Sequence, residues 1–358
     1  MTVYRLGVLE CDGIGPEVVG SALEVLRVAV SIEPEIRLDL IPLPVGLSAI
    51  HSHGTALPQS TVDALRGCAG WILGPHDSQS YPEPERAKLN PSGVLRRDFD
   101  LFANIRPARA YPGLRATSPK MDLVIVRENT EGFYADRNMV AGTGEFKPTP
   151  DIAMAVGFVT RRATERIARA AFDLARTRRK RVSIVHKANV LRLTMGLFRD
   201  VCREVAAEYP DVTVDDWHVD AMAALLVRRG HDFDVLVTEN MLGDILSDLA
   251  GELAGSLGMA GSINAGTSVA MAQATHGSAP DIAGRGIANP VGMIQSVALL
   301  VRWLAERHAD DGLARTAARM SAAVEVALAD ESCRTPDLGG RATTQDLTAR
   351  IVAALAAS

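Results

Sequence analysis

The sequence has little of several features that would mark a specialised class of protein. Its four cysteines are scattered along the chain and form no CxxC pair. We therefore expect reduced thiols, and neither a disulfide framework nor a zinc site. No apolar run approaches the length of a membrane span, and no N-terminal targeting segment is visible. These absences lead us to expect a cytoplasmic protein that does not contact a membrane.

A strong charge of either sign is also missing, because the net charge is only −5. This value gives no support to a nucleic-acid partner, which would call for a basic surface. The one basic run extends from Arg176 to Arg181 and closes a helical pattern. Cations there complement the carbonyl end of a helix, so the run is predicted to be a solvated cap.

The chain is long enough, at 358 residues with 47% hydrophobic, to bury more than one core. Two domains are the default expectation for this length. Strand and helix patterns alternate along much of the chain, which favours an α/β fold. Strands are predicted near residues 6–9, 71–73, 123–126, 182–185 and 233–237, and helices near 16–30 and 194–208.

A dinucleotide fingerprint of the G-x-G-x-x-G type is absent as well. Gly13, Gly15 and Gly20 follow the first strand, but the third spacing is wrong. Gly13 and Gly15 are therefore predicted to form a tight turn into a helix, and any nucleotide must be held in another way.

The most informative segment that is present runs from Thr238 to Asp248, directly after an apolar strand pattern. Gly243 is predicted to precede a helix, and Asp244 and Asp248, four residues apart, then share one face of it. Two like charges repel unless a cation lies between them, and Mg²⁺ prefers such oxygen ligands. The alternative is that both acids only favour the dipole at a helix N-terminus.

Three arginines, Arg96, Arg106 and Arg127, are spaced through one region and would suit a substrate with several carboxylates. Taken singly, each arginine is better explained as part of a surface ion pair. Tyr134 and Lys187 both follow apolar strands, where they are candidates for proton transfer. A core tyrosine and a solvated lysine are the alternatives.

A long segment of small residues spans 276–290 and is predicted to be an irregular loop. Loops of this composition let backbone approach a ligand closely. A purely structural Ω-loop is the alternative.

Together these segments resemble the β-decarboxylating dehydrogenases, which include the isocitrate, homoisocitrate, isopropylmalate and tartrate/malate dehydrogenases. The resemblance runs over nearly the whole chain. It rests on DGIGPE at 12–17, LR at 95–96, NIRP at 104–107, RENTEG at 127–132, VHKAN at 185–189, VDAM at 219–222, NMLGDILSD at 240–248, the loop at 276–290 and RTPDLGG at 334–340.

The resemblance implies a role for each candidate residue. Arg96, Arg106 and Arg127 would hold the substrate carboxylates. Mg²⁺ or Mn²⁺ would be bound by Asp244 and Asp248 together with Asp220 of the partner subunit. Lys187, also contributed across subunits, would help to remove the hydroxyl proton, and Tyr134 would protonate the enolate carbon. A homodimer with shared active sites is therefore expected.

The nucleotide expectation also comes from the resemblance. The loop would hold the adenosine half of the cofactor through His276, Gly277, Ser278, Ala279, Asp281, Ile282 and Asn289. Asp281 stands where NAD-linked members carry an acid, and its charge would repel a 2′-phosphate. A fraction of that repulsion gives about tenfold discrimination, so NAD is the predicted cofactor.

Substrate choice in this family depends on residues just before Arg96. Here these are Asn90 and Ser92, which offer hydrogen bonds and little apolar surface. An isocitrate-like acid with a polar C3 substituent is ranked first. Tartrate/D-malate or isopropylmalate dehydrogenase, or a non-catalytic regulatory subunit of a heteromeric isocitrate dehydrogenase, are the alternatives.

The resemblance finally implies a two-domain α/β fold of the isopropylmalate/isocitrate dehydrogenase type, with the active cleft between the domains. The large, nucleotide-binding domain would combine residues 1–99 and 252–358. The small domain, residues 100–251, would carry the metal and catalytic residues and the dimer contact.

Overall fold

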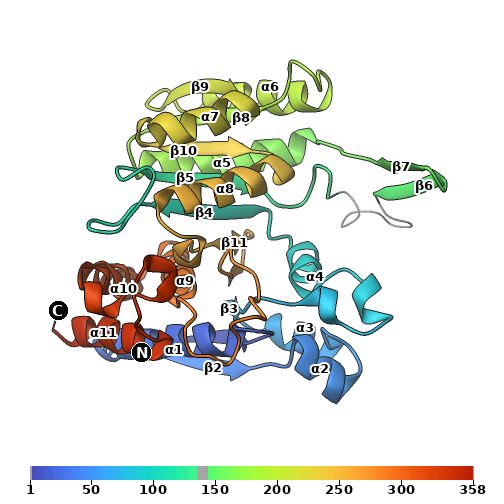
Figure 1. Ribbon diagram of the computed structural model, residues 1–358. Coiled ribbons are helices and arrows are strands. Elements are labelled where there is room, and N and C mark those ends of the chain that lie inside the picture. The colour runs from blue at the N-terminus through green and yellow to red at the C-terminus, as the bar shows by residue number, and fades with distance from the viewer. Residues whose placement is uncertain (1, 135–143, 358) are drawn as a thin grey trace. The chain divides into compact units, whose positions relative to one another are not determined.

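The computed structural model describes residues 2–134 and 144–357, and its chain divides into two compact units. Unit 1 consists of Met1–Leu95, Tyr111–Arg115 and Gly255–Ser358, and unit 2 of Arg96–Ala110 and Ala116–Ala254. Each unit combines a mostly parallel sheet with helices, which confirms the α/β prediction (Figure 1). Within the described residues, no helix has both the length and the apolar character needed to cross a bilayer.

The sheet of unit 1 places its strands in the order β2–β1–β3–β12–β11. The first four run parallel, and β11 is antiparallel to β12. Their bounds are β1 Thr2–Leu9, β2 Ile36–Pro42, β3 Gly70–Leu73, β11 Ile263–Ala265 and β12 Ala270–Ala272.

Helix α1 (Gly15–Ser31) follows the first strand and packs against α9 and α11. It begins as the sequence predicts, with Gly13 in a left-handed turn at φ 58° and Pro16 in its first turn. The other α-helices of this unit are α2 Gly46–His53, α3 Gln59–Leu65, α9 Val291–His308, α10 Asp311–Ala329 and α11 Thr344–Ala356. The short helix α4 (Pro91–Asp98) begins in unit 1, and its Arg96 belongs to unit 2.

The sheet of unit 2 has the order β4–β5–β10–β8–β9, with β4 antiparallel to β5 and the other neighbours parallel. The strands are β4 Ala103–Arg109, β5 Asp122–Glu128, β8 Arg181–His186, β9 Thr213–His218 and β10 Val235–Thr238. Parallel neighbours end at the same edge, so side chains just beyond β5, β8 and β10 gather there.

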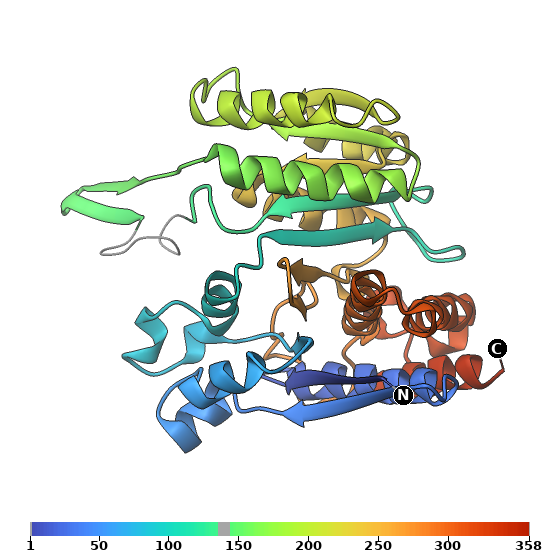
Figure 2. The same cartoon turned by 180° about the vertical axis from the view of Figure 1, so that it is seen from behind.

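Helices cover both faces of this sheet (Figure 2), and successive strand residues alternate between two cores. Val124 and Val126 pack beneath α5 (Arg161–Arg176) and α6 (Thr194–Ala206). Leu123 and Ile125 face the opposite side, where α7 and α8 supply Met222, Leu226, Leu246 and Ala250. Helix α7 spans Val219–Arg229 and α8 spans Asn240–Ala254. Burial on both faces explains the uninterrupted apolar runs at 123–126 in β5 and 235–237 in β10.

A two-stranded hairpin, β6 (Glu145–Thr149) and β7 (Ile152–Ala155), extends away from the sheet of unit 2 (Figures 1 and 2). Every one of its strand residues is exposed. Isolated two-stranded hairpins are marginally stable in water, so this one needs additional contacts to persist.

The start of α8 differs from the prediction. The helix begins at Asn240, so Gly243 lies inside its first turn and not before it. A Cβ at Gly243 would stand only 2.8 Å from Cβ of Arg127 and 2.7 Å from its Cγ. Glycine therefore serves here to let the arginine stem pack against the helix.

The prediction of a solvated basic cap is wrong for Arg178. Its side chain is only 22% exposed and donates to Asp234, a carboxylate that is 1% exposed, at 2.8 Å. A buried carboxylate needs a charged or hydrogen-bonding partner, and composition alone could not reveal this one. The neighbouring Arg176 is exposed and pairs with Asp211, as a surface cap would.

Candidate functional site

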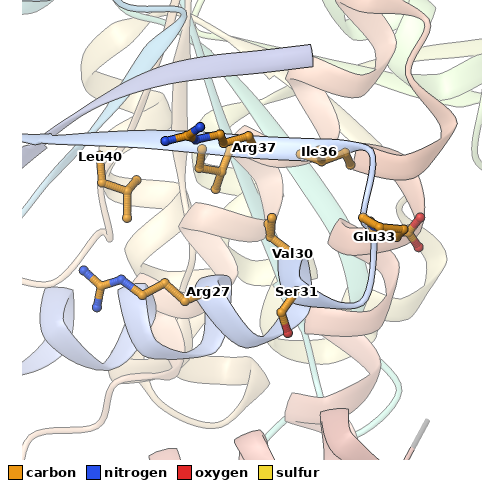
Figure 3. A pocket seen from close by; sticks show the side chains of 9 residues that line it. Arg27, Val30, Ser31, Glu33, Ile36, Arg37 and Leu40 are labelled. Atoms are coloured by element: carbon orange, nitrogen blue, oxygen red, sulfur yellow. The ribbon is translucent and has the colours of Figure 1, made fainter. Parts of the chain in front are cut away.

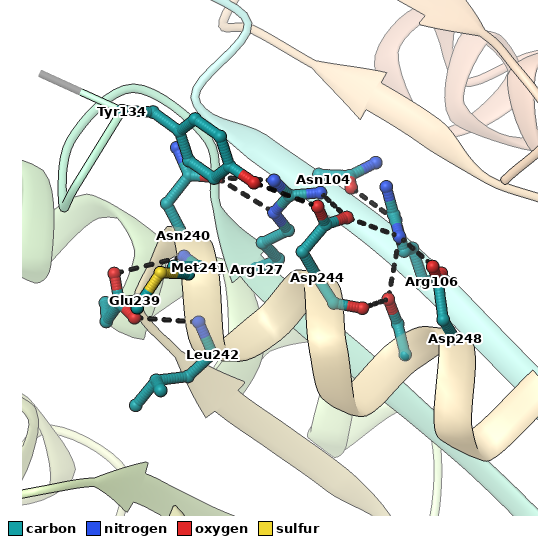
Figure 4. Close-up of polar contacts among 11 residues, drawn as sticks. Asn104, Arg106, Arg127, Tyr134, Glu239, Asn240, Met241, Leu242, Asp244 and Asp248 are labelled. Atoms are coloured by element: carbon teal, nitrogen blue, oxygen red, sulfur yellow. Dashed lines mark hydrogen bonds and ion pairs between the residues drawn. The ribbon is translucent and has the colours of Figure 1, made fainter.

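Three elements of unit 2 bring four charged side chains together (Figure 4). Arg106 comes from β4, Arg127 from β5, and Asp244 and Asp248 from one face of α8. The four are called the charge cluster below. It unites two of the predicted carboxylate-binding arginines with two of the predicted metal ligands.

Arginine–aspartate contacts organise the charge cluster. Nη1 of Arg127 lies 2.5 Å from Oδ1 of Asp244, and Nη1 of Arg106 lies 3.1 Å from the same oxygen. Arg106 also reaches Oδ1 of Asp248 at 3.2 Å. The arginine side chains are 2% and 8% exposed, whereas Asp248 is 51% exposed, so the cluster is anchored by buried cations and opens at its acids.

Tyr134 joins the charge cluster from the segment after β5. Its hydroxyl donates to Oδ2 of Asp244 at 3.2 Å, and the guanidinium of Arg127 lies 5.7 Å from the centre of its ring. A phenol in this position can deliver a proton to a ligand bound between the arginines and the helix.

The electrostatics differ between the two acids. Burial disfavours ionisation of Asp244, but the positive charges of Arg127 and Arg106 outweigh it and hold its pKa below the usual range. Arg96 also contributes to this lowering. Burial raises the pKa of Asp248, and the neighbouring charge of Asp244 adds to the rise. Burial, with the nearby charge of Arg127, lowers the pKa of Arg106 to about 10.

Several polar residues that hold the cluster received no role from the sequence. Oδ1 of Asn240 accepts two hydrogen bonds from Arg127, at 2.9 and 2.6 Å, and Oδ1 of Asn104 accepts one from Arg106 at 2.6 Å. Sequence spacing could have identified both residues. Asn104 lies two residues from Arg106 and shares its strand face, and Asn240 lies four residues from Asp244 and shares its helix face.

Glu239 positions the helix that bears the aspartates. It is 2% exposed, and its carboxylate accepts from the backbone N–H groups of Leu242, at 2.7 Å, and Met241, at 3.1 Å. These donors have no partner within the helix, so the carboxylate acts as an N-cap. Burial raises the pKa of Glu239 despite these bonds.

Lys187 and Asp220 form a second pair in unit 2. Nζ of Lys187 donates to Oδ1 of Asp220 at 2.6 Å, and this contact lowers the pKa of the carboxylate. Lys187 directly follows β8, and Asp220 lies in the first turn of α7. The side chain of Asp220 is 68% exposed, so it is accessible to a further ligand.

No group of three His, Cys, Asp or Glu side chains in the described part of the chain is arranged to hold a metal ion. Asp244 and Asp248 offer hard oxygen donors one turn apart on α8, which fits part of a Mg²⁺ or Mn²⁺ shell. Substrate, water and groups of another subunit are the usual sources of the further ligands in such a shell.

The predicted loop at 276–290 contains neither helix nor strand between β12 and α9, as expected. It is fastened at several points within unit 1. The N–H of Ile14 donates to the carbonyl of Ser278 at 2.9 Å, and the N–H of Gly284 donates to Glu17 at 2.6 Å. Gly13 is required at this approach, since a Cβ there would stand 2.0 Å from the Ser278 oxygen.

Two loop residues have informative side chains. Burial lowers the pKa of His276, and its Nε2 has no hydrogen-bond partner among the described residues. Such an unsatisfied buried nitrogen suits a polar group of a ligand. Asn289 is 6% exposed and already donates to Asp337 at 2.9 Å and accepts from Val291 at 3.0 Å. Asp281 is exposed, and Ala279 has a positive φ of 40°.

The two residues predicted to read the substrate are involved in the start of α4. Oδ1 of Asn90 accepts from the N–H of Gly93 at 2.8 Å and from the hydroxyl of Ser92 at 3.0 Å. Ser92 is 5% exposed and also lies 3.0 Å from Nε2 of His76. Its hydroxyl is therefore tied to protein groups in this structure.

Unit 1 also has a groove of about 440 Å³ between α1 and β2 (Figure 3). Arg27 and Arg37 line it together with the apolar side chains of Val30 and Leu40. None of the predicted site residues lines this groove, so it is not the candidate active site.

Comparison with known proteins identifies the family. The family model "Isocitrate/isopropylmalate dehydrogenase" matches residues 5–351. An isocitrate/homoisocitrate dehydrogenase of Thermus thermophilus is 42% identical over 98% of both chains. A 3-isopropylmalate dehydrogenase of Archaeoglobus fulgidus is 39% identical over 98% of this chain and 99% of its own. The crystal structure of isocitrate dehydrogenase from Methylococcus capsulatus is 38% identical, with a TM-score of 0.85 over 98% of this chain and 99% of that one.

The chain therefore belongs to the isocitrate/isopropylmalate dehydrogenase family and is an oxidoreductase of the β-decarboxylating type. This confirms the family, the fold and the enzyme class predicted from the sequence. Members of the family generally use NAD(P) and a divalent metal and act on hydroxy acids.

Proposed function

We propose that this enzyme uses NAD⁺ and Mg²⁺ or Mn²⁺ to oxidise and decarboxylate an isocitrate-like 3-carboxy-2-hydroxy acid. The products are a 2-oxo acid, CO₂ and NADH. The charge cluster is the observation that carries the proposal, because two buried guanidinium groups there meet two carboxylates one helical turn apart. The similarity to an isocitrate/homoisocitrate dehydrogenase supports the choice of substrate class.

The residues divide into two binding tasks. Arg96, Arg106 and Arg127 hold the substrate carboxylates, for which planar guanidinium forks are well suited. Asp244 and Asp248 hold the divalent cation with Asp220 of the partner subunit. When bound, NAD⁺ accepts a hydride and the cation supplies Lewis acidity next to the substrate oxygens.

Two further residues move protons. Lys187 of the partner subunit takes the hydroxyl proton as the C2–O bond becomes a carbonyl. After the β-carboxylate leaves as CO₂, Tyr134 protonates the enolate carbon. The contact of its hydroxyl with Asp244 orients the phenol toward the same space that the arginines serve. The fixed charges of Arg106 and Arg127 need little rearrangement as charge shifts on the substrate.

NAD⁺ is assigned to the loop at 276–290 in unit 1, the nucleotide-binding unit. A cavity of about 380 Å³ adjoins this loop and is lined by Gly13, Tyr81, Pro280 and Ala283 among others. The unsatisfied nitrogen of His276 and the exposed carboxylate of Asp281 support a ribose-binding role and discrimination against NADP⁺.

A homodimer with shared sites accompanies this assignment. The exposed hairpin β6–β7 presents Phe146, Ile152 and Met154, each about half exposed at 49–51%. Ile245 of α8 is also 60% exposed, beside the aspartates. Apolar surface of this kind favours cover by a second copy. Among the described residues, no third His, Cys, Asp or Glu completes a metal site with Asp244 and Asp248.

The test is NADH formation with Mg²⁺ or Mn²⁺ on isocitrate, homoisocitrate, isopropylmalate, D-malate and tartrate. We expect isocitrate or homoisocitrate to give the highest rate of NADH formation. We expect the enzyme to be saturated at a lower concentration of NAD⁺ than of NADP⁺. A dominant response to isopropylmalate would contradict the polar-pocket assignment of Asn90 and Ser92. Bound NAD⁺ without turnover on any substrate would favour a regulatory subunit.

A further inference from the structure

His186 is buried next to the proposed catalytic lysine, and both of its ring nitrogens are engaged. It is the last residue of β8, 2% exposed, and it immediately precedes Lys187. Its Nδ1 lies 3.1 Å from the backbone nitrogen of Ala188, and its Nε2 lies 3.0 Å from Oδ1 of Asp216. The imidazole therefore holds the backbone on the far side of Lys187.

The partners fix the state of the ring. A backbone N–H can only donate, so Nδ1 must accept and the proton must reside on Nε2, which donates to the Asp216 carboxylate. Burial, together with the charges of His218 and Arg199, lowers the pKa of His186 against the opposing effect of Asp216. The neutral form keeps the Nδ1 lone pair that Ala188 needs.

A third residue secures the carboxylate. Nη2 of Arg203, on α6, donates to Oδ2 of Asp216 at 2.7 Å. The strands support this arrangement, because β8 and β9 run parallel in a register that pairs His186 with His218. A chain of hydrogen bonds thus links a surface arginine to the turn that carries Lys187.

We infer that His186 is a positioning residue, whose Nδ1–Ala188 hydrogen bond sets where Lys187 leaves the end of β8 and meets Asp220. This deepens the proposed function, since it rests on the proton-accepting role of Lys187. Displacing a reacting group by about 1 Å can cost about 100-fold in rate, so one backbone hydrogen bond at this turn is sufficient to matter.

Two substitutions of His186 distinguish the role of Nδ1 from that of Nε2. In His186→Asn the side-chain oxygen can take the place of Nδ1 and accept from Ala188. In His186→Gln the amide reaches toward Asp216, near the place of Nε2, and leaves Ala188 without its acceptor. We expect the Asn variant to keep kcat within about threefold of wild type and the Gln variant to lose about 10- to 100-fold, with KM for NAD⁺ unchanged in both. Equal kcat values in two variants of equal thermal stability would overturn the inference.

A readout without turnover keeps this inference separate from the proposed function. The chain has only five lysines, Lys88, Lys120, Lys147, Lys180 and Lys187, so ¹³C reductive methylation gives few signals. The signal that disappears in the Lys187→Arg variant is assigned to Lys187. We expect the chemical shift of the Lys187 methyl groups to change in His186→Gln and to stay unchanged in His186→Asn; an unchanged shift in both variants would refute the positioning role. Full activity in Lys187→Ala would instead refute the catalytic role of Lys187 and leave the NMR result to decide the positioning.

Discussion

Two regions of unit 2 use the same chemical groups for different purposes. On the surface, α5 is joined to α6 and to the turn after it by an alternating ladder of Arg161, Glu165, Arg169, Glu204 and Glu208. Its side chains are 34–57% exposed. In the charge cluster, the guanidinium groups are buried and only the acids reach solvent. In the ladder both partners of each ion pair are solvated, whereas in the cluster buried cations hold two partly exposed carboxylates one helical turn apart.

The comparison teaches that burial of the cations beside partly exposed acids, and not the number of ion pairs, distinguishes the charge cluster from a surface ion-pair network. Exposed pairs are screened by water and contribute little. Buried arginines keep their geometry and strong field without rearranging when a ligand arrives. The following predictions test this distinction.

The largest effect is expected for Asp244→Asn, which removes the carboxylate that contacts both arginines. We expect kcat/KM to fall by about 10³-fold, the order associated with losing one preorganised electrostatic group. Steady-state kinetics on the responding substrate measures this. Activity within tenfold of wild type would show that the cluster is only structural.

A smaller effect is expected for Gly243→Ala. The added methyl group would meet the stem of Arg127 at 2.7–2.8 Å, so the arginine must shift. We expect a loss of about 1–3 kcal/mol in the free energy of unfolding, together with a raised substrate KM. Denaturant unfolding and kinetics measure the two quantities.

Gly20→Ala is the matched control for that substitution. Gly20 also lies within a helix, but nothing stands within 4 Å of its Cβ position. We expect this variant to gain about 0.4–1 kcal/mol and to keep its KM. Equal losses in both variants would show that helical glycine itself, and not the approach of Arg127, determines the result.

Opposite effects on stability are expected at the two acids of the ligand-free protein. The lowered pKa of Asp244 means that its charge stabilises the fold above the unfolded value of about 4, and this is lost as pH falls through the folded pKa. The raised pKa of Asp248 means that its charge costs stability once pH rises through the folded value.

At neutral pH, Asp248→Asn should therefore raise the melting temperature and Asp244→Asn should lower it. Each change should be worth no more than about 1 kcal/mol, because both acids are partly exposed. Below about pH 4 the gain of the Asp248 variant should vanish. Melting scans at neutral pH and below pH 4 measure both effects. Melting temperatures that shift in the same direction in the two variants at neutral pH, or a gain of Asp248→Asn that persists below pH 4, would contradict the assigned shifts.

The smallest effect is expected for Glu204→Gln in the ladder. It breaks the contact with Arg161 on the surface. We expect unchanged kcat/KM and a slight loss of thermal stability that disappears in high salt, since exposed charges are screened there. A loss of activity as large as that of Asp244→Asn would remove the distinction between the two regions.

Much of the architecture was predictable because burial leaves a clear pattern. The strand around 123–126 is apolar on both faces, that around 182–185 is apolar except for Ser183, and the structure places both between helix layers. The Asp244–Asp248 spacing likewise predicted a shared helix face, which α8 provides.

What escaped prediction depends on contacts between distant segments. The packing of Gly243 against Arg127 and the pairing of Arg178 with buried Asp234 join residues more than fifty positions apart. Asn240 lies in the motif at 240–248, but the motif did not predict that its carboxamide holds Arg127. Local patterns predict faces and turns, but they do not reveal which polar groups satisfy a buried charge.

The most direct test of the central claim is Mn²⁺ binding in the presence of isocitrate. Binding is measured as the loss of the electron paramagnetic resonance signal of free Mn²⁺. The charge cluster as ligand site predicts substrate-dependent Mn²⁺ binding to the wild type and to Glu204→Gln, and none to Asp244→Asn. Equal Mn²⁺ binding by all three proteins would contradict the account.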